Sequence, residues 1–222
     1  MAANLAKVRE ELDASSAKVT LIAVTKHATT AQMQEAFHSG VKDFGENKLQ
    51  DALKRREELE SAAPQTVGNC NWHFIGHLQT NKVKQAVGKF ALIHSVDSLK
   101  LAREVSRIAE QKGITQPILL QVKLLRDDNK SGFSQDELRS VLPEIIKLPC
   151  LKVEGLMTIS PLTEDREIWK KSFAGLNSFR QELSNSFNLE LKELSMGMSD
   201  DWRDAITYGS TMIRLGRAIF GS

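Results

Sequence analysis

One lysine stands at the end of an apolar run near the start of the chain. The run covers residues 19–26, reads Val-Thr-Leu-Ile-Ala-Val-Thr-Lys and ends in Lys26. Such a run of β-branched residues without polar alternation predicts a strand that is buried on both faces, as in a parallel sheet covered by helices. In α/β barrels the carboxyl ends of the strands carry the reactive side chains. The amine of Lys26 is therefore a candidate nucleophile for a carbonyl group.

Two roles fit Lys26. Like most lysines, it can extend into solvent while its stem covers apolar surface. Alternatively, desolvation and neighbouring cations lower its pKa, so that the neutral amine attacks an aldehyde and forms a Schiff base. Lowering the pKa from ~10.4 to ~7.5 requires a preference of about 4 kcal/mol for the neutral amine. The rest of the chain has to supply the partners that decide between the two.

Three later strand ends carry glycines and small hydroxyl groups. Segments 155–158, 195–199 and 214–217 read Gly-Leu-Met-Thr, Ser-Met-Gly-Met-Ser and Arg-Leu-Gly-Arg. Such residues let backbone N–H groups approach an anion, and the loops after strands seven and eight of a barrel are its usual phosphate position. Each glycine also fits a plain turn, and Ser199 is expected to begin a short helix.

Polar residues within or next to other apolar strands have both a structural and a chemical interpretation. An unpaired guanidinium at Arg214 inside a strand would be unfavourable, so Arg214 needs an anion or another hydrogen-bond acceptor, and a carboxylate of the protein is the structural interpretation. Asn47 can cap the following helix, and Trp72, His73 and His77 can pack at a strand end. A Schiff-base lysine, two phosphate loops and an arginine between them describe a site for an aldehyde that carries a phosphate. Pyridoxal phosphate fits that description.

The elements that must position these residues alternate between strand and helix along all 222 residues. Expected strands cover residues 19–26, 41–47, 71–78, 90–95, 117–123, 153–159, 189–196 and 211–215. Eight βα units without a linker predict a single (β/α)8 TIM barrel, one domain over residues 1–222. The chain ends seven residues after Leu215, so a helix over 2–14 is expected to fill the place of the last helix. A doubly wound open sheet is the alternative, without the G-x-G-x-x-G of dinucleotide sites.

Helix start signals support this division. Thr29 with Gln32 and Ser134 with Glu137 have the spacing of a capping box, and Asp97 is expected to be the N-cap of a helix that runs to about residue 112.

Composition excludes several classes of protein. The net charge of +2 is small and its charges are interspersed, which argues against nucleic-acid binding. No apolar run is long enough to span a membrane. Cys70 and Cys150 lie far apart without zinc-binding spacing, so they indicate neither a metal site nor a disulfide framework. Without a disulfide framework, a reducing cytoplasm is expected.

At these residues the sequence resembles the YggS/PROSC-type pyridoxal phosphate homeostasis proteins over nearly its whole length. The segments that carry the resemblance are 21–26, 44–47, 72–82, 155–158, 194–201 and 214–221. The loop over residues 123–132 departs from the pattern, because it lacks the asparagine and glutamate expected in many relatives. The resemblance implies a barrel of the alanine racemase N-terminal-domain type, with an extra N-terminal helix and no C-terminal β-domain.

The resemblance also implies a cofactor site. Pyridoxal phosphate is expected on Lys26 as an internal aldimine, with Asn47 nearby and Arg214 at the pyridine nitrogen. Ser195, Gly197 and Gly216 are expected to hold the phosphate. The full set of expected cofactor-binding residues is Lys26, Asn47, Met157, Thr158, Ser195, Gly197, Met198, Arg214 and Gly216.

The expected role is intracellular homeostasis of pyridoxal phosphate (vitamin B6), with an indirect effect on amino and keto acid balance. The alternative is a small racemase or decarboxylase. Racemisation needs a second base opposite the lysine, and the single tyrosine, Tyr208, precedes the last strand, where packing explains it. We therefore expect a monomeric carrier rather than an enzyme, with pyridoxal-phosphate-dependent apoenzymes as recipients.

Overall fold

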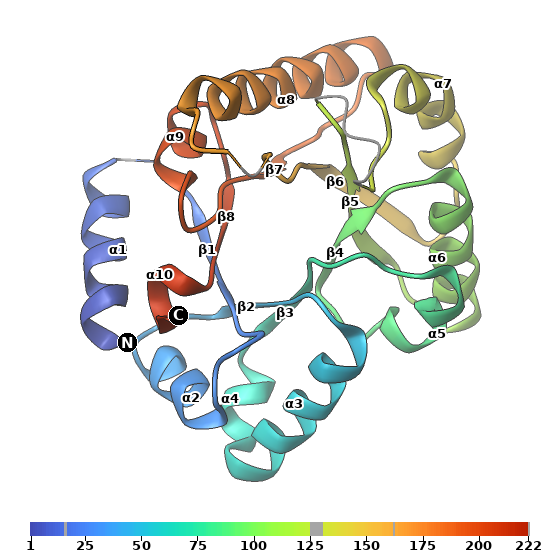
Figure 1. The fold of residues 1–222 in the computed structure, drawn as a ribbon. Helices are drawn as coiled ribbons and strands as arrows, with labels where there is room; N and C mark the ends of the chain where they lie inside the picture. Colours follow the sequence, from blue (N-terminus) through green and yellow to red (C-terminus); the bar gives the residue numbers. More distant parts are fainter. Residues whose placement is uncertain (16, 125–130, 162, 222) are drawn as a thin grey trace.

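The computed structural model describes residues 1–15, 17–124, 131–161 and 163–221, and its strands close into a parallel barrel in sequence order (Figure 1). The strands are β1 (Thr20–Val24), β2 (Asp43–Glu46), β3 (Asn71–Phe74), β4 (Leu92–Val96), β5 (Gln116–Gln121), β6 (Leu151–Met157), β7 (Glu193–Ser195) and β8 (Met212–Leu215). Strand β1 pairs with both β2 and β8 and so closes the ring. The predicted (β/α)8 barrel is confirmed and the open sheet is wrong.

Helices surround the barrel on its outside (Figure 1). They are α1 (Ala2–Ala14), α2 (Thr30–His38), α3 (Leu49–Ala62), α4 (Pro64–Gly68), the 3-10 turn η1 (Thr80–Lys82), α5 (Val83–Ala86), α6 (Leu99–Gln111), α7 (Gln135–Ile145), α8 (Arg166–Phe187), α9 (Trp202–Thr207) and α10 (Arg217–Phe220). Helix α10 is short, and α1 packs beside it, as expected of the N-terminal helix. Helix α4 was not predicted; it begins with Pro64 at its first position, where proline is favourable.

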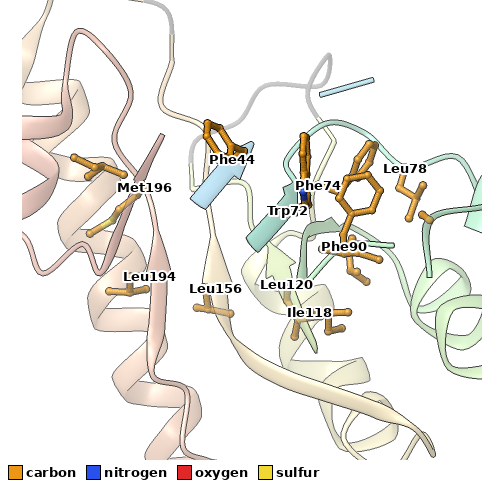
Figure 2. Close-up of a cluster of buried hydrophobic side chains, with 14 of the residues drawn as sticks. Phe44, Trp72, Phe74, Leu78, Phe90, Ile118, Leu120, Leu156, Leu194 and Met196 are labelled. Atoms are coloured by element: carbon orange, nitrogen blue, oxygen red, sulfur yellow. The ribbon is translucent and has the colours of Figure 1, made fainter. Parts of the chain in front are cut away.

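The main core lies between the strands and the helices, and Figure 2 shows part of it. Its labelled side chains are Phe44, Trp72, Phe74, Leu78, Phe90, Ile118, Leu120, Leu156, Leu194 and Met196, all of them buried. Each large side chain stabilises the fold by roughly 1.5–3 kcal/mol through burial. Because both faces of the strands are covered, β4 is buried at every position, its polar residues His94 and Ser95 included.

A second, smaller cluster fills the barrel interior. Its members are Ile22, Leu92, Leu119, Met157 and Met212. Side chains two positions apart on a strand share a face, so His94 lies above Leu92 and Arg214 above Met212. The interior therefore changes from apolar to polar toward the carboxyl ends of the strands.

The strands are shorter than predicted where loops begin early. Strand β7 covers Glu193–Ser195 instead of residues 189–196, and β1 ends at Val24, so Thr25 and Lys26 belong to the following turn. Of the polar loop predicted over residues 126–133, and of the departing segment 123–132, residues 125–130 lie outside the described part of the chain.

Both predicted capping boxes are confirmed, at Thr29 and at Ser134. The predicted N-cap at Asp97 is wrong, because the hydroxyl of Ser98 accepts from the Leu101 amide, while the Asp97 carboxylate lies 3.1 Å from His77 Nδ1. Sequence cannot separate two adjacent residues that both favour caps.

The predicted helix start at Ser199 is also wrong. Helix α9 begins at Trp202 with Asp201 as its N-cap. The Ser199 hydroxyl instead accepts a hydrogen bond of 3.2 Å from the amide of Ala218, in the first turn of α10. Ser199 therefore connects the loop after β7 to the loop after β8.

Candidate cofactor site

Lys26 lies in a turn directly after β1, at the carboxyl end of the barrel. The amide of Ala28 donates to the Thr25 carbonyl at 3.0 Å and closes this turn. The Lys26 side chain is exposed and makes no hydrogen bond or ion pair with the described residues. Of the two positions considered for Lys26, the structure shows the exposed one, because the turn carries the lysine beyond the end of the buried strand.

Two residues that sequence reasoning missed hold this turn. Arg55 of α3 donates to the carbonyls of Thr25, Ala28 (3.0 Å) and Lys26 (3.4 Å). Its Nε lies 3.2 Å from Oε1 of Glu46, a fully buried carboxyl that also accepts from the Thr25 hydroxyl. Burial raises the pKa of Glu46, and the bond from Thr25 and the charge of Arg55 oppose that rise. The clamp fixes the backbone that carries Lys26.

Arg214 lies on β8, the strand next to β1, and pairs in register with Ile22. It is 4% exposed, its Nη1 donates to Ser195 Oγ at 2.7 Å, and its Nη2 donates to the Thr158 carbonyl at 2.9 Å. No carboxylate of the described residues accepts from it. Burial lowers the pKa of Arg214 to about 10, against the opposing charge of Asp201, so the guanidinium stays charged at neutral pH.

Two of the expected binding residues, Ser195 and Thr158, contact Arg214, and a third, Met157, lies in the barrel interior. The Ser195 hydroxyl is fully buried and is shared between Arg214 and Nδ1 of His94, 2.8 Å away. The Thr158 hydroxyl donates to the Val122 carbonyl at 2.9 Å. Met157 lies in the apolar interior cluster. The Ser195 hydroxyl therefore lies at the arginine and not at the glycine loops where the phosphate was expected.

The two expected glycines differ in the room that their surroundings leave for a side chain. Gly197 has φ of +96°, and a Cβ there would lie 2.8 Å from the Ala205 Cβ. A Cβ on Gly216 would lie 3.4 Å from the carbonyl oxygen of Val24, at the end of β1. The backbone around Gly216 therefore runs beside the strand end that leads to Lys26.

Met198 lines a cavity of about 670 Å³ between the loops after β6 and β7, together with Ile159, Trp169 and other residues. Its amide donates to Oδ1 of Asp201 at 2.5 Å. That donor is therefore already used by the protein, and Met198 presents its side chain to the cavity.

Asn47 follows β2 and does not cap α3, whose N-cap is Lys48 without a side-chain bond. It lines a hollow of about 440 Å³ with His77 and Lys82. Trp72 packs on Phe44, with ring centroids 5.9 Å apart, as the structural interpretation expected. Asn47 thus lies at the barrel mouth, two strands away from Arg214.

Of the residues that sequence reasoning missed, Glu46 and His94 carried a signal in the sequence and Arg55 did not. Glu46 is a charged residue at the end of an apolar strand, the signal that identified Lys26, and His94 is a lone histidine within β4. Arg55 gave no signal, because it lies among many charges on α3.

Within residues 1–15, 17–124, 131–161 and 163–221, no group of three or more His, Cys, Asp or Glu side chains could hold a metal, and no helix is long and apolar enough to cross a bilayer.

Comparisons with known proteins identify the family of the chain. The family model for the alanine racemase N-terminal domain matches residues 1–222. A pyridoxal phosphate homeostasis protein of Synechocystis sp. is 44% identical over 206 residues, which cover 91% of each chain. A protein of the same name from Escherichia coli K12 is 32% identical, over 100% of this chain and 96% of its own.

Solved structures give the same result. PipY of Synechococcus elongatus, solved with PLP bound, is 40% identical and superposes with a TM-score of 0.90 over 99% of each chain. An alanine racemase of Clostridium difficile, at 15% identity, shares the fold with a TM-score of 0.74, over 92% of this chain and 53% of its own. The chain belongs to the alanine racemase N-terminal-domain family and, within it, to the pyridoxal phosphate homeostasis proteins.

Proposed function

We propose that this protein binds pyridoxal phosphate at the carboxyl ends of β1, β7 and β8 and acts in the homeostasis of that cofactor. Lys26 supplies the primary amine for the aldehyde, and Arg214 faces the ring nitrogen. The backbone around Gly197 and Gly216 holds the phosphate. The name shared by the relatives and the PLP-bound structure of PipY support this function.

The residues present fit the cofactor. An exposed primary amine, a buried guanidinium without a carboxylate partner among the described residues, and a glycine turn without room for a Cβ are the donors that such a group needs. Asn47 completes the set from the β2 side of the mouth. When bound, pyridoxal phosphate supplies a ring that withdraws electrons from an attached amino group.

Arg214 is the observation that carries the proposal. A guanidinium donates hydrogen bonds only and keeps its charge, so it favours a ring nitrogen without a proton. An unprotonated ring withdraws electrons weakly. This arrangement supports holding the cofactor over using it for carbanion chemistry.

The position of Tyr208 also argues against a racemase. Tyr208 ends α9 and precedes β8, so it lies at the amino end of the strands, across the barrel from Lys26. Its ring packs against the main core. Tyr208 therefore cannot act as a second base opposite Lys26 in this fold, which disfavours the racemase alternative.

The first test measures cofactor retention. Purified protein is loaded with pyridoxal phosphate, freed of excess, and compared with Lys26→Ala and with Lys18→Ala, which removes an exposed lysine at the other end of β1. Wild type and Lys18→Ala keep the bound cofactor and its visible absorbance, whereas Lys26→Ala loses both. Equal retention by Lys26→Ala would contradict the assignment of Lys26.

The second test measures turnover. Loaded protein is incubated with common L-amino acids, and D-amino acids and amines are measured by chiral chromatography. We expect no product above that formed with Lys26→Ala. Sustained racemisation or decarboxylation by the wild type would replace the carrier role by the enzyme alternative.

The proposal includes a monomeric cytoplasmic carrier that passes its cofactor to apoenzymes. Light scattering of the loaded protein tests the monomer. Mixing the loaded protein with an apoenzyme tests the transfer. The apoenzyme has to gain the cofactor faster than the protein releases it into solution.

A further inference from the structure

A chain of polar side chains crosses the barrel interior from β2 to β8. Oδ1 of Asp43 lies 3.0 Å from His73 Nε2, and His73 Nδ1 lies 2.9 Å from His94 Nε2. His94 Nδ1 lies 2.8 Å from Ser195 Oγ, which accepts from Arg214 at 2.7 Å. We call Asp43, His73, His94 and Ser195 the histidine chain. It ends on the guanidinium that the proposed function assigns to the cofactor ring.

The histidine chain is buried in the barrel interior, a region that aliphatic side chains usually fill in such barrels. His94 and Ser195 have no exposed surface, and His73 is 4% exposed. Buried polar groups are stable only when each has a partner. Asp43 is the accessible end: it lines a surface hollow of about 580 Å³ near the amino end of β2 and also accepts from Asn71 Nδ2 at 3.0 Å.

The charges of Asp43 and Arg214 decide which atoms donate and which accept hydrogen bonds along the histidine chain. Burial raises the pKa of Asp43, but hydrogen bonds from His73 and Asn71 bring its net pKa below the usual value, so it is an ionised acceptor. Arg214 is only a donor. Burial lowers the pKa of His94 well below 6.5, and the charge of Arg214 and any proton on His73 lower it further, so the His94 imidazole is neutral.

Only one arrangement with neutral imidazoles satisfies every atom. His73 uses its Nε2–H on Asp43 and accepts at Nδ1, so His94 must donate from Nε2 and accept at Nδ1. Ser195 then donates its O–H to His94 and accepts from Arg214. The reverse direction, in which His94 donates to Ser195, requires an extra proton on His73 or on Asp43.

We propose that the histidine chain positions Arg214 at the cofactor's ring nitrogen, and that Asp43 fixes its direction from the opposite end of the barrel. This inference rests on the proposed function for its ligand. Asp43, His73, His94 and Ser195 are positioning residues, since they act through Arg214. The second bond of Arg214, to the Thr158 carbonyl, holds the other end of the guanidinium.

The test of the direction uses ¹⁵N NMR of the histidine side chains in protein without cofactor. We expect both His73 and His94 to carry hydrogen on Nε2 and none on Nδ1. Asp43→Ala is expected to change the tautomer of His94, which it does not touch. The matched control is Glu193→Ala, which removes a carboxylate at the start of β7 that accepts from Thr211 and lies outside the chain.

Hydrogen on Nδ1 of His94 in the wild type overturns the proposed direction, and this spectrum decides even if Asp43→Ala does not fold. An unchanged His94 tautomer in folded Asp43→Ala overturns the control by Asp43. With cofactor, Asp43→Ala is expected to release pyridoxal phosphate faster by roughly two- to tenfold, the effect of one hydrogen bond, while Glu193→Ala is unchanged. Equal release rates overturn the positioning role. If wild type binds no cofactor, the proposed function and this role fail, while the tautomers still report on the chain itself.

Discussion

Replacing His94 by glutamine should make the stability of the fold less sensitive to acid. His94 is fully buried in β4; burial lowers its pKa well below 6.5, and the charge of Arg214 and any proton on His73 lower it further. In the unfolded chain the same side chain takes up a proton near its ordinary pKa of about 6.5. Below that pH the unfolded state therefore binds one proton more than the folded state, so stability falls as the pH falls.

The magnitude follows from proton linkage. While folded His94 stays neutral, each pH unit below about 6.5 lowers the free energy of unfolding by about 1.4 kcal/mol. Glutamine does not titrate and keeps an amide donor and acceptor, so His94→Gln removes this slope. The difference in the free energy of unfolding between wild type and His94→Gln is therefore expected to shrink by about 1.4 kcal/mol for each pH unit below about 6.5.

Urea unfolding, followed by circular dichroism from about pH 5 to about pH 8, measures both curves. Titrating groups that do not contact His94 are common to the two proteins and cancel in the difference. Above about pH 7.5 the two curves should run parallel, because histidine is neutral in both states there. Curves that stay parallel down to about pH 5 would refute the reasoning, since His94 would then take up its proton in the folded protein as well.

Three further predictions follow from other parts of the fold. Arg55→Ala removes the donor to three carbonyls of the turn after β1, so amide exchange there should accelerate; unchanged exchange would contradict the clamp. Gly155→Ala places a Cβ 1.9 Å from the Glu193 carbonyl oxygen and should destabilise the fold by about 1–3 kcal/mol in urea unfolding, whereas Gly68→Ala, with open space at that position, should not. Burial raises the pKa of Cys70 to about 11, so about 0.1% is thiolate at pH 8; alkylation followed by mass spectrometry should be far slower than for a free thiol, and an equal rate would contradict the burial.

The sequence predicted the barrel because its information is local. Apolar strand runs, capping residues and strand-end glycines each report on a few neighbouring residues, and eight repeats of that pattern leave one topology. The same locality identified Lys26 and Arg214, since a charged residue in or at the end of an apolar strand is conspicuous. It also explains why Asp97 was preferred to Ser98 as a cap.

Contacts across the barrel could not be predicted in this way. The Ser195 hydroxyl turns to Arg214 and His94 because β4, β7 and β8 bring these side chains to one level of the interior, which depends on strand tilt and register. Arg55 reaches the turn after β1 from α3, the second helix after that turn in the sequence. Neither contact leaves a pattern within one segment of sequence.

Reduction of the loaded protein with borohydride tests the central claim most directly. The reduction fixes pyridoxal phosphate covalently to the lysine that holds it, and peptide mass analysis then locates that lysine. The label is expected on Lys26 alone, in near-stoichiometric amount, and not on Lys48 or Lys82 at the neighbouring hollow. A label on another lysine, or protein that remains unlabelled after loading, would contradict the assignment of Lys26 as the residue that binds the cofactor.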